Sequence, residues 1–254
     1  ENTLQDLGIP VFHDDQHGTA IVLLAGLINA ARATGKKMEE LNVVISGAGA
    51  AGIAIARIIR CIGHDPKICE QVKSLLVCDS SGIISAGRPN LNREKEALLA
   101  FSNQDNIKGT LHDALKGADV FIGVSKANLL KPEDIALMAP DPFIFALANP
   151  EPEIMPDLAK AAGASVVATG RSDFPNQVNN LLVFPGIFRG ALDARARVIT
   201  QGMKIAAAHA LARYVENPTS ESILPSPLDK NVPKVIAAAV KLRAISEGVA
   251  RVIE

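Results

Sequence analysis

The chain has 254 residues, a length that suits one large domain or two small ones. It is 48% hydrophobic but only 4% aromatic, with no tryptophan, so its core must be built from Ala, Val, Ile and Leu. The formal net charge of −1 argues against a nucleic-acid or membrane partner, and no apolar run approaches the ~18 residues that span a bilayer.

The first predicted element is a helix at residues 19–34, and two adjacent carboxylates stand at its entrance. Asp14 and Asp15 belong to the segment FHDDQHGTA. Adjacent carboxylates repel each other and lose solvation when buried, a conflict that either a cation or plain solvent exposure would resolve. In an extended segment the two side chains would point to opposite sides, so each would serve a different group. Gly35 is suited to end the helix.

Short apolar runs then alternate with helical segments. The predicted strands are at 41–46, 74–79, 119–124, 142–148, 165–170 and 181–184. A helix is predicted at 52–63, another after the capping box of Thr110 and Asp113, and a third with Pro132 in its first turn. This alternation predicts an α/β fold, a doubly wound parallel sheet of the Rossmann type.

The segment from about residue 190 onward is predicted to be helical. The run ARVITQGMKIAAAHALARYV is followed by a proline-rich loop at 217–233 and then by VPKVIAAAVKLRAISEGVARVI. With the helix at 19–34, these are additional N- and C-terminal helices around the sheet. Because they are rich in alanine, they are suited to pack against another subunit, and we expect a homo-oligomer of undetermined order.

The cysteines and the first residue bear on the setting of the protein. Cys61, Cys69 and Cys78 are odd in number and too widely spaced for a metal-binding pair. We therefore expect reduced thiols and a cytoplasmic protein. Because the sequence begins with Glu1 and not with methionine, we also expect a fragment or a trimmed chain.

A glycine-rich turn joins the strand at 41–46 to the next helix. Its residues are Gly47, Ala48, Gly49, Ala50, Ala51 and Gly52. The first glycine makes the turn, the second lets backbone approach a pyrophosphate, and the third packs the helix on the strand. The helix N-terminus offers free N–H groups to the phosphates. In this strand–turn–helix context, dinucleotide binding is favoured over a turn that serves packing alone.

Asp79 ends the second predicted strand, where an acidic residue usually binds the adenosine ribose. Its separation from Gly52 exceeds the usual ~20 residues, and the insertion at 64–73 accounts for the difference. An acidic residue here favours NAD by repelling a 2′-phosphate. Four residues nearby would instead accept that phosphate: Ser80, Ser81, Arg88 and Arg93. The choice between NAD and NADP therefore stays open.

Asparagines lie at two other strand boundaries. Asn149 follows the strand at 142–148 and precedes Pro150, so it either faces a ligand beyond the sheet or forms a turn. Asn179 and Asn180 are poor strand formers, so they either make a turn or bind something.

Three segments together resemble the malic enzymes, most closely the bacterial type. They are FHDDQHGTA (12–20), VVISGAGAAGIA (43–54), and FALANPEPEI (145–154) with TGRSDFPNQVNNLLVFPG (169–186). The resemblance covers essentially the whole chain, in order. It implies oxidative decarboxylation of (S)-malate to pyruvate and CO₂ with NAD or NADP and with Mg²⁺ or Mn²⁺.

The resemblance also implies roles for individual residues. Asp15 becomes a metal ligand, and Asp14 a supporting catalytic acid beside a catalytic lysine. The remaining assignments are cofactor contact for Thr19, Ser125, Asn149 and Asn179, and substrate contact for Asn149 and Asn180.

Malic enzymes also have a preceding domain, which holds a tyrosine acid, a lysine base and a Glu-Asp pair of metal ligands. Tyr214 lies outside any matching motif, Lys36 and Lys37 resemble a solvated helix end, and Glu1 is too near Asp15 to be the missing ligand. We therefore interpret residues 1–254 as the NAD(P)-binding domain, with the N-terminal substrate domain absent.

Two alternatives stay open. A metal-independent two-domain dehydrogenase, such as an amino-acid dehydrogenase, would share the sheet but would not need Asp14 and Asp15. A non-catalytic nucleotide-binding module would also fit a chain that lacks half of the catalytic residues.

Overall fold

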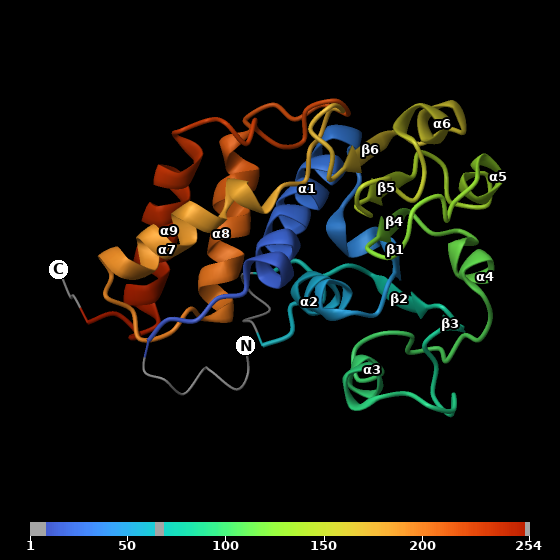
Figure 1. The fold of residues 1–254 in the computed structure, drawn as a ribbon, viewed down its shortest axis with the longest axis horizontal. Helices are drawn as coiled ribbons and strands as arrows, with labels where there is room; N and C mark the ends of the chain where they lie inside the picture. The colour runs from blue at the N-terminus through green and yellow to red at the C-terminus, as the bar shows by residue number, and fades with distance from the viewer. Residues whose placement is uncertain (1–8, 64–68, 252–254) are drawn as a thin grey trace.

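The computed structural model describes residues 9–63 and 69–251, and its six-stranded sheet lies in the right-hand part of the view in Figure 1. The strand order is β3-β2-β1-β4-β5-β6, and every neighbouring pair is parallel except β2 and β3. The strands are β1 Asn42–Ser46, β2 Ser74–Asp79, β3 Gly82–Ile83, β4 Val120–Gly123, β5 Phe143–Ala146 and β6 Val166–Thr169. The order reverses between β1 and β4, as in dinucleotide-binding sheets, so the predicted doubly wound α/β fold is confirmed.

Helices cover both faces of this sheet because alternate residues of each strand point to opposite sides. On one face Val43 and Ile45 share an apolar cluster with residues of α1, α2 and α8. On the other face Val44 belongs to the cluster of α4, α5 and α6. The bounds of these helices are α1 Thr19–Thr34, α2 Ala50–Ile59, α4 Leu111–Leu115, α5 Pro132–Ile135, α6 Pro156–Ala161 and α8 Gln201–Tyr214. Helix α3, Arg93–Leu98, follows β3.

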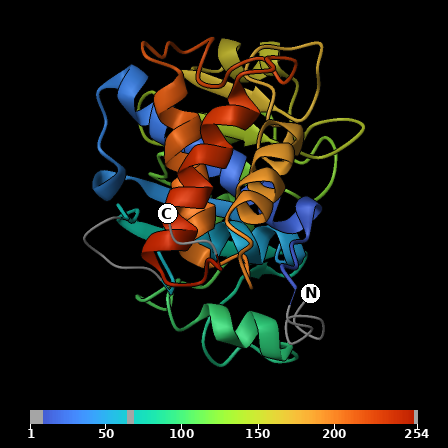
Figure 2. The same ribbon diagram turned by 90° about the vertical axis from the view of Figure 1, so that its left-hand side faces the viewer.

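The C-terminal helices form a layer beside α1, as Figures 1 and 2 show from two sides. Helix α7 spans Phe184–Asp193 and α9 spans Val232–Ser246. A Cβ on Gly190 would lie 2.5 Å from the carbonyl oxygen of Ala237. A glycine at this position therefore lets α7 and α9 pack in close contact.

Several predicted elements are confirmed at the level of single residues. Helix α1 ends at Gly35, which has a left-handed φ of 72°. The capping box predicted at Thr110 and Asp113 is present at the start of α4. Pro132 is the first residue of α5. These features depend on neighbouring residues alone, so the local sequence is sufficient to specify them.

The strand predicted at 181–184 is wrong. The Asn179 side chain accepts a hydrogen bond from the Leu181 N–H and starts a 3₁₀ turn, Asn180–Leu182. Helix α7 follows at once, with Pro185 in its first turn. The sixth strand of the sheet is instead β3, which pairs with β2. The sequence does not predict it, because two residues are too few to show alternation.

Some helix boundaries also differ from the prediction. Helix α2 begins at Ala50 and ends at Ile59, not at residue 63. In the C-terminal part, α8 begins only at Gln201, because the Thr200 side chain accepts from the Met203 N–H and caps the helix there.

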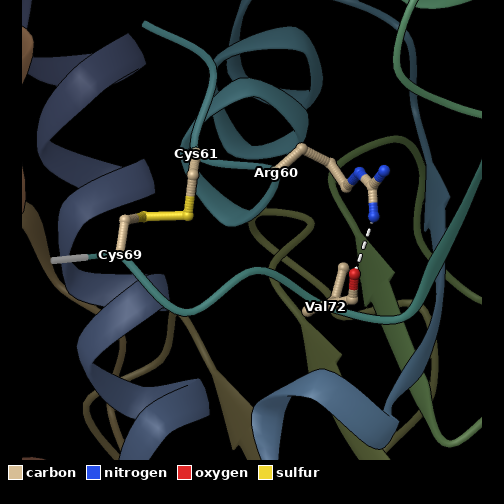
Figure 3. Close-up of a disulfide and its surroundings, with 4 residues drawn as sticks. All are labelled: Arg60, Cys61, Cys69 and Val72. Atoms are coloured by element: carbon tan, nitrogen blue, oxygen red, sulfur yellow. Dashed lines mark hydrogen bonds between the residues drawn. A yellow bond between two sulfur atoms is a disulfide. The ribbon is translucent and has the colours of Figure 1, made fainter. Parts of the chain in front are cut away.

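The prediction of reduced thiols is wrong for two of the three cysteines. Cys61 and Cys69 form a disulfide (Figure 3), while Cys78 is free and buried. The chain turns after α2, where Cys61 has a φ of 54°. A 2.7 Å hydrogen bond from Arg60 Nη1 to the Val72 carbonyl joins the end of α2 to the segment before β2. Sequence spacing does not reveal this turn. The disulfide removes the thiol argument for a cytoplasmic protein.

Two further expectations concern the limits of the chain. Glu1, on which the interpretation as a fragment rests, lies outside the described residues. So does the first part of the insertion predicted at 64–73. Within 9–63 and 69–251, no helix has the length and apolar composition that crossing a membrane requires.

Candidate cofactor and active site

The glycine-rich turn lies where the sequence predicts it, between β1 and α2. Gly47 has a φ of 124°, and its N–H donates to the Cys78 carbonyl at 2.9 Å. A Cβ on Gly52 would lie 1.8 Å from the Gly47 carbonyl oxygen, so no side chain fits there. A Cβ on Gly49, in contrast, would meet no atom within 4 Å. Two of the glycines thus serve packing, and Gly49 faces open space.

An open groove of about 840 Å³ lies in front of this turn. Gly49 is the N-cap of α2 and no side chain caps the helix, so its first N–H groups are available to a ligand. The groove is also lined by Gln16 and His17, next to the acidic pair, and by Arg93 of α3. It therefore joins the glycine-rich turn to the segment that holds Asp14 and Asp15.

Asp79 ends β2 as predicted, but it does not stand alone. Its carboxylate pairs with Arg88, with Lys95 Nζ at 2.6 Å, and accepts from the Ser81 N–H at 2.9 Å. Burial acts to raise the pKa of Asp79, but the hydrogen bonds from Lys95, Arg88 and Ser81 outweigh it and lower the pKa to about 2. Two cations around one carboxylate leave this cluster with a formal charge of +1.

Asp14 and Asp15 lie in a π-helical turn, Asp14–Gly18, and not in the extended segment that we predicted. The backbone closes because the His17 N–H donates to the His13 carbonyl at 2.9 Å. The two side chains still differ, since Asp14 is half-buried and Asp15 is exposed. A Cβ on Gly18 would lie 2.2 Å from Asp14 Oδ1, so this glycine makes room for the carboxylate.

The Asp14 carboxylate is only partly satisfied. Asn180 Nδ2 donates to its Oδ2 at 2.6 Å, whereas Oδ1 is buried and has no hydrogen-bond partner in the described part of the chain. Burial, followed by the charge of Asp15, raises the pKa of Asp14. The structure therefore brings Asn180 to Asp14 across the fold and leaves one buried carboxylate oxygen without a partner among the described residues.

The described residues hold no complete metal centre. Nowhere in 9–63 and 69–251 do three His, Cys, Asp or Glu side chains gather closely enough to hold an ion. Asp15 is exposed, and its carboxylate is a hard oxygen donor of the kind that Mg²⁺ and Mn²⁺ prefer. It fits such a cation as one member of its ligand set.

The other predicted residues lie in different loops and at different helix starts. Ser125 follows β4 and Asn149 follows β5, and both are exposed beyond the carboxyl ends of the strands. Asn179 caps the 3₁₀ turn, and Thr19 is the first residue of α1, half-buried. Ser125 Oγ lies 3.4 Å from Ser46 Oγ of β1. The end of β1 and the loop after β4 therefore adjoin.

Glu153 is a buried carboxylate at this edge that sequence analysis missed. It is 0% exposed and accepts from the N–H groups of Ser125 and Ala148. Its position in NPEPEI, between prolines and an isoleucine, is a signal that could have identified it, because a charged residue in an apolar stretch needs a partner.

Two residues that sequence analysis set aside have structural partners. Tyr214 donates to Asp229 Oδ2 at 2.7 Å. Lys36 is not a solvated helix end, since it pairs with Asp119 at 3.2 Å beside the start of β4.

The chain was compared with known proteins. Residues 16–245 match the family model described as malic enzyme, NAD binding domain. The chain is 52% identical to the bifunctional malic/malolactic enzyme of Bacillus subtilis, covering 99% of this chain and 60% of that protein. It is 49% identical to the NAD-dependent malic enzyme of Geobacillus stearothermophilus, covering 97% and 50%.

A solved structure gives the same result for the fold. The malic enzyme of Pyrococcus horikoshii superposes with a TM-score of 0.91 at 47% identity, covering 100% of this chain and 59% of that one. The chain thus spans half to three fifths of the length of these relatives.

The cluster around Asp79 predicts how stability depends on pH. Because its folded pKa of about 2 is below the unfolded value of ~3.9, its contribution is present above pH ~4 and is lost as pH falls towards 2. We expect Asp79→Asn to lower the free energy of unfolding by about 1–2 kcal/mol at pH 7, allowing for solvent screening. At pH 3 about half of this difference should be lost.

Urea denaturation of both proteins at the two pH values measures this, with Asp105→Asn as the control at an exposed position. A difference between Asp79→Asn and wild type that does not change with pH would contradict the assignment.

Proposed function

This chain belongs to the malic enzyme family, and from that premise we propose that it binds NAD or NADP and that the complete protein oxidatively decarboxylates (S)-malate to pyruvate and CO₂. The observation that carries the proposal is the groove that the glycine-rich turn shares with the Asp14–Gly18 turn. Its lining joins the N-terminus of α2 to Gln16 and His17 of the turn that carries the two carboxylates. A dehydrogenase without a metal would not need the second feature.

The residues of the turn would receive the pyrophosphate at the N–H groups of α2. The cluster at Asp79 would then meet the adenosine ribose, and Ser125, Asn149 and Asn179 the nicotinamide ribose. The bound nicotinamide would supply the hydride acceptor. The loops after β4 and β5 would orient it, because ligands of open α/β sheets lie beyond the carboxyl ends of the strands.

We infer that both NAD and NADP are accepted. Asp79 would repel a 2′-phosphate only if its charge were unopposed. With Arg88 and Lys95 against it, the cluster carries a formal charge of +1, which tolerates the extra phosphate. The cluster also offers the ribose hydroxyls an ionised carboxylate, because its pKa is about 2.

Asp15 would hold Mg²⁺ or Mn²⁺ together with ligands from outside the described residues. The bound cation would stabilise negative charge on the substrate oxygen. Asn180 fixes Asp14 through its Oδ2, and the fixed carboxylate would support the catalytic lysine that we expect in a preceding domain. That domain would also supply the tyrosine acid. Asn149 and Asn180 would contact malate.

We further infer a homo-oligomer in the cytoplasm. The alanine-rich helices α8 and α9 support the first inference. The cytoplasmic location rests on the family resemblance alone, because two of the three cysteines form a disulfide and so do not indicate a reducing compartment.

Gly49→Val is the first test. The position has space for a side chain, so the melting temperature should change little, but the valine would occupy the place of the pyrophosphate. We expect calorimetric titration with NAD or NADP to detect binding to wild type and none to Gly49→Val. Gly52→Ala should behave differently and lower the melting temperature, because its Cβ meets the Gly47 carbonyl. Normal binding by a folded Gly49→Val protein would contradict the proposed phosphate site.

A second test concerns turnover. The isolated chain, mixed with malate, Mn²⁺ and either nucleotide, should reduce the nucleotide at least ~10²–10⁴-fold more slowly than the complete protein, because positioned acid and base groups are absent. Absorbance of the reduced nucleotide measures it. A full-rate reaction would mean that the catalytic residues are wrongly assigned. Binding without turnover even in the complete protein would favour the non-catalytic module.

The third test separates the two carboxylates in the complete protein. Asp15→Asn removes a negative charge from the cation's ligands, so the apparent Mn²⁺ constant should rise and added Mn²⁺ should restore part of the activity. Asp14→Asn should lower turnover, by about 10²-fold, and leave the Mn²⁺ constant nearly unchanged. If Asp15→Asn lowers only the melting temperature, Asp15 is a helix-entry residue and not a ligand.

A further inference from the structure

The strands β4 and β5 separate at their carboxyl ends, and Glu153 lies at the point of separation. These strands are neighbours in the sheet (Figure 1). The ladder between them ends with the Leu147 N–H donating to the Gly123 carbonyl at 3.0 Å. Ser125 and Ala148, just beyond, have no strand carbonyl as acceptor. Their N–H groups donate instead to the Glu153 carboxylate, at 3.1 Å to Oε1 and 3.0 Å to Oε2.

The carboxylate therefore continues the ladder beyond its last backbone hydrogen bond. One oxygen holds the loop after β4 and the other holds the loop after β5, so the spacing of the loops is set by the width of one carboxylate. The backbone of Glu153 strengthens the link, since its carbonyl accepts from the Leu130 N–H at 2.9 Å. The Pro152 carbonyl likewise accepts from the Asn128 N–H at 3.0 Å.

A glycine on β4 makes room for this carboxylate. A Cβ on Gly123 would lie 2.2 Å from Glu153 Cδ and 2.4 Å from its Oε1. The side chain thus packs directly over the strand backbone, where any other residue at position 123 would exclude it. Burial also raises the pKa of Glu153, with the hydrogen bonds from Ala148 and Ser125 opposing that effect. A fully buried carboxylate is costly, and it suits a place where two N–H groups need one acceptor-only partner.

We propose that Glu153 is a positioning residue that sets the distance between the Ser125 loop and the Asn149 loop and so orients the nicotinamide half of the bound dinucleotide. The inference rests on the proposed function, because it takes Ser125 and Asn149 as contacts of the nicotinamide ribose. Glu153 itself is covered by protein, so it would act on a bound cofactor only through its neighbours. Its effect is transmitted through the two backbone N–H groups.

Comparison of NAD with ADP tests this role, because ADP contains the adenosine and pyrophosphate but lacks the nicotinamide half. Glu153→Gln keeps the shape but directs an NH₂ group at one of the two N–H donors. We expect NAD affinity to fall about 10- to 100-fold, while ADP affinity stays within about twofold. Glu153→Asp keeps the charge and should recover part of the NAD affinity.

Glu151→Gln is the matched control. Glu151 is two positions away and exposed, and it accepts from Asn128 Nδ2 at 3.0 Å, so its loss should change neither affinity. Equal losses of NAD and ADP affinity in Glu153→Gln, or no loss, would overturn the positioning role. If Glu153→Gln does not fold, the same comparison in Glu153→Asp decides. Failure of wild type to bind NAD would instead overturn the proposed function, and this inference with it.

Discussion

The close approach of α2 to β1 is the constraint on which the candidate site depends. Because a Cβ on Gly52 would lie 1.8 Å from the Gly47 carbonyl, the helix packs at a distance that only glycine permits. This contact fixes the helix N-terminus at the carboxyl end of β1, beside the point where the strand order reverses. The uncapped N–H groups and about half a positive charge from the helix dipole then face the groove.

Two acidic side chains at this edge are held by partners from other elements, and they show how the fold orients the remaining groups. Asn180, just before α7, fixes Asp14 in front of α1. The N–H groups of Ser125 and Ala148 fix Glu153. Asp14 is therefore positioned by a residue from a distant part of the sequence, and Glu153 is shared between the loops after β4 and β5. The first contact needs the C-terminal part of the chain in place, and the second needs β4 and β5 paired.

The features that the sequence predicts well are those that depend on neighbouring residues. The αL cap at Gly35, the capping box at Thr110 and the glycine-rich turn each follow from a few adjacent side chains. The strand prediction for 181–184 is wrong because an apolar run of four residues suits a strand and a helix equally. Two residues beside the run favour the helical conformation: Asn179 caps the 3₁₀ turn, and Pro185 lies in the first turn of α7. The disulfide between Cys61 and Cys69 depends on a turn that spacing alone does not reveal.

Asp79 marks the limit of prediction for the site itself. Its place at the end of β2 follows from the sequence, but its electrostatic effect does not, because the partners that reverse it come from the loop after β3 and from α3. A lone carboxylate would repel a 2′-phosphate, whereas this cluster has one excess positive charge. The sign of the local charge is therefore a property of the packed loops. An acidic residue at the end of β2 is evidence of ribose binding in this fold, but evidence of NAD preference only when its charge is unopposed.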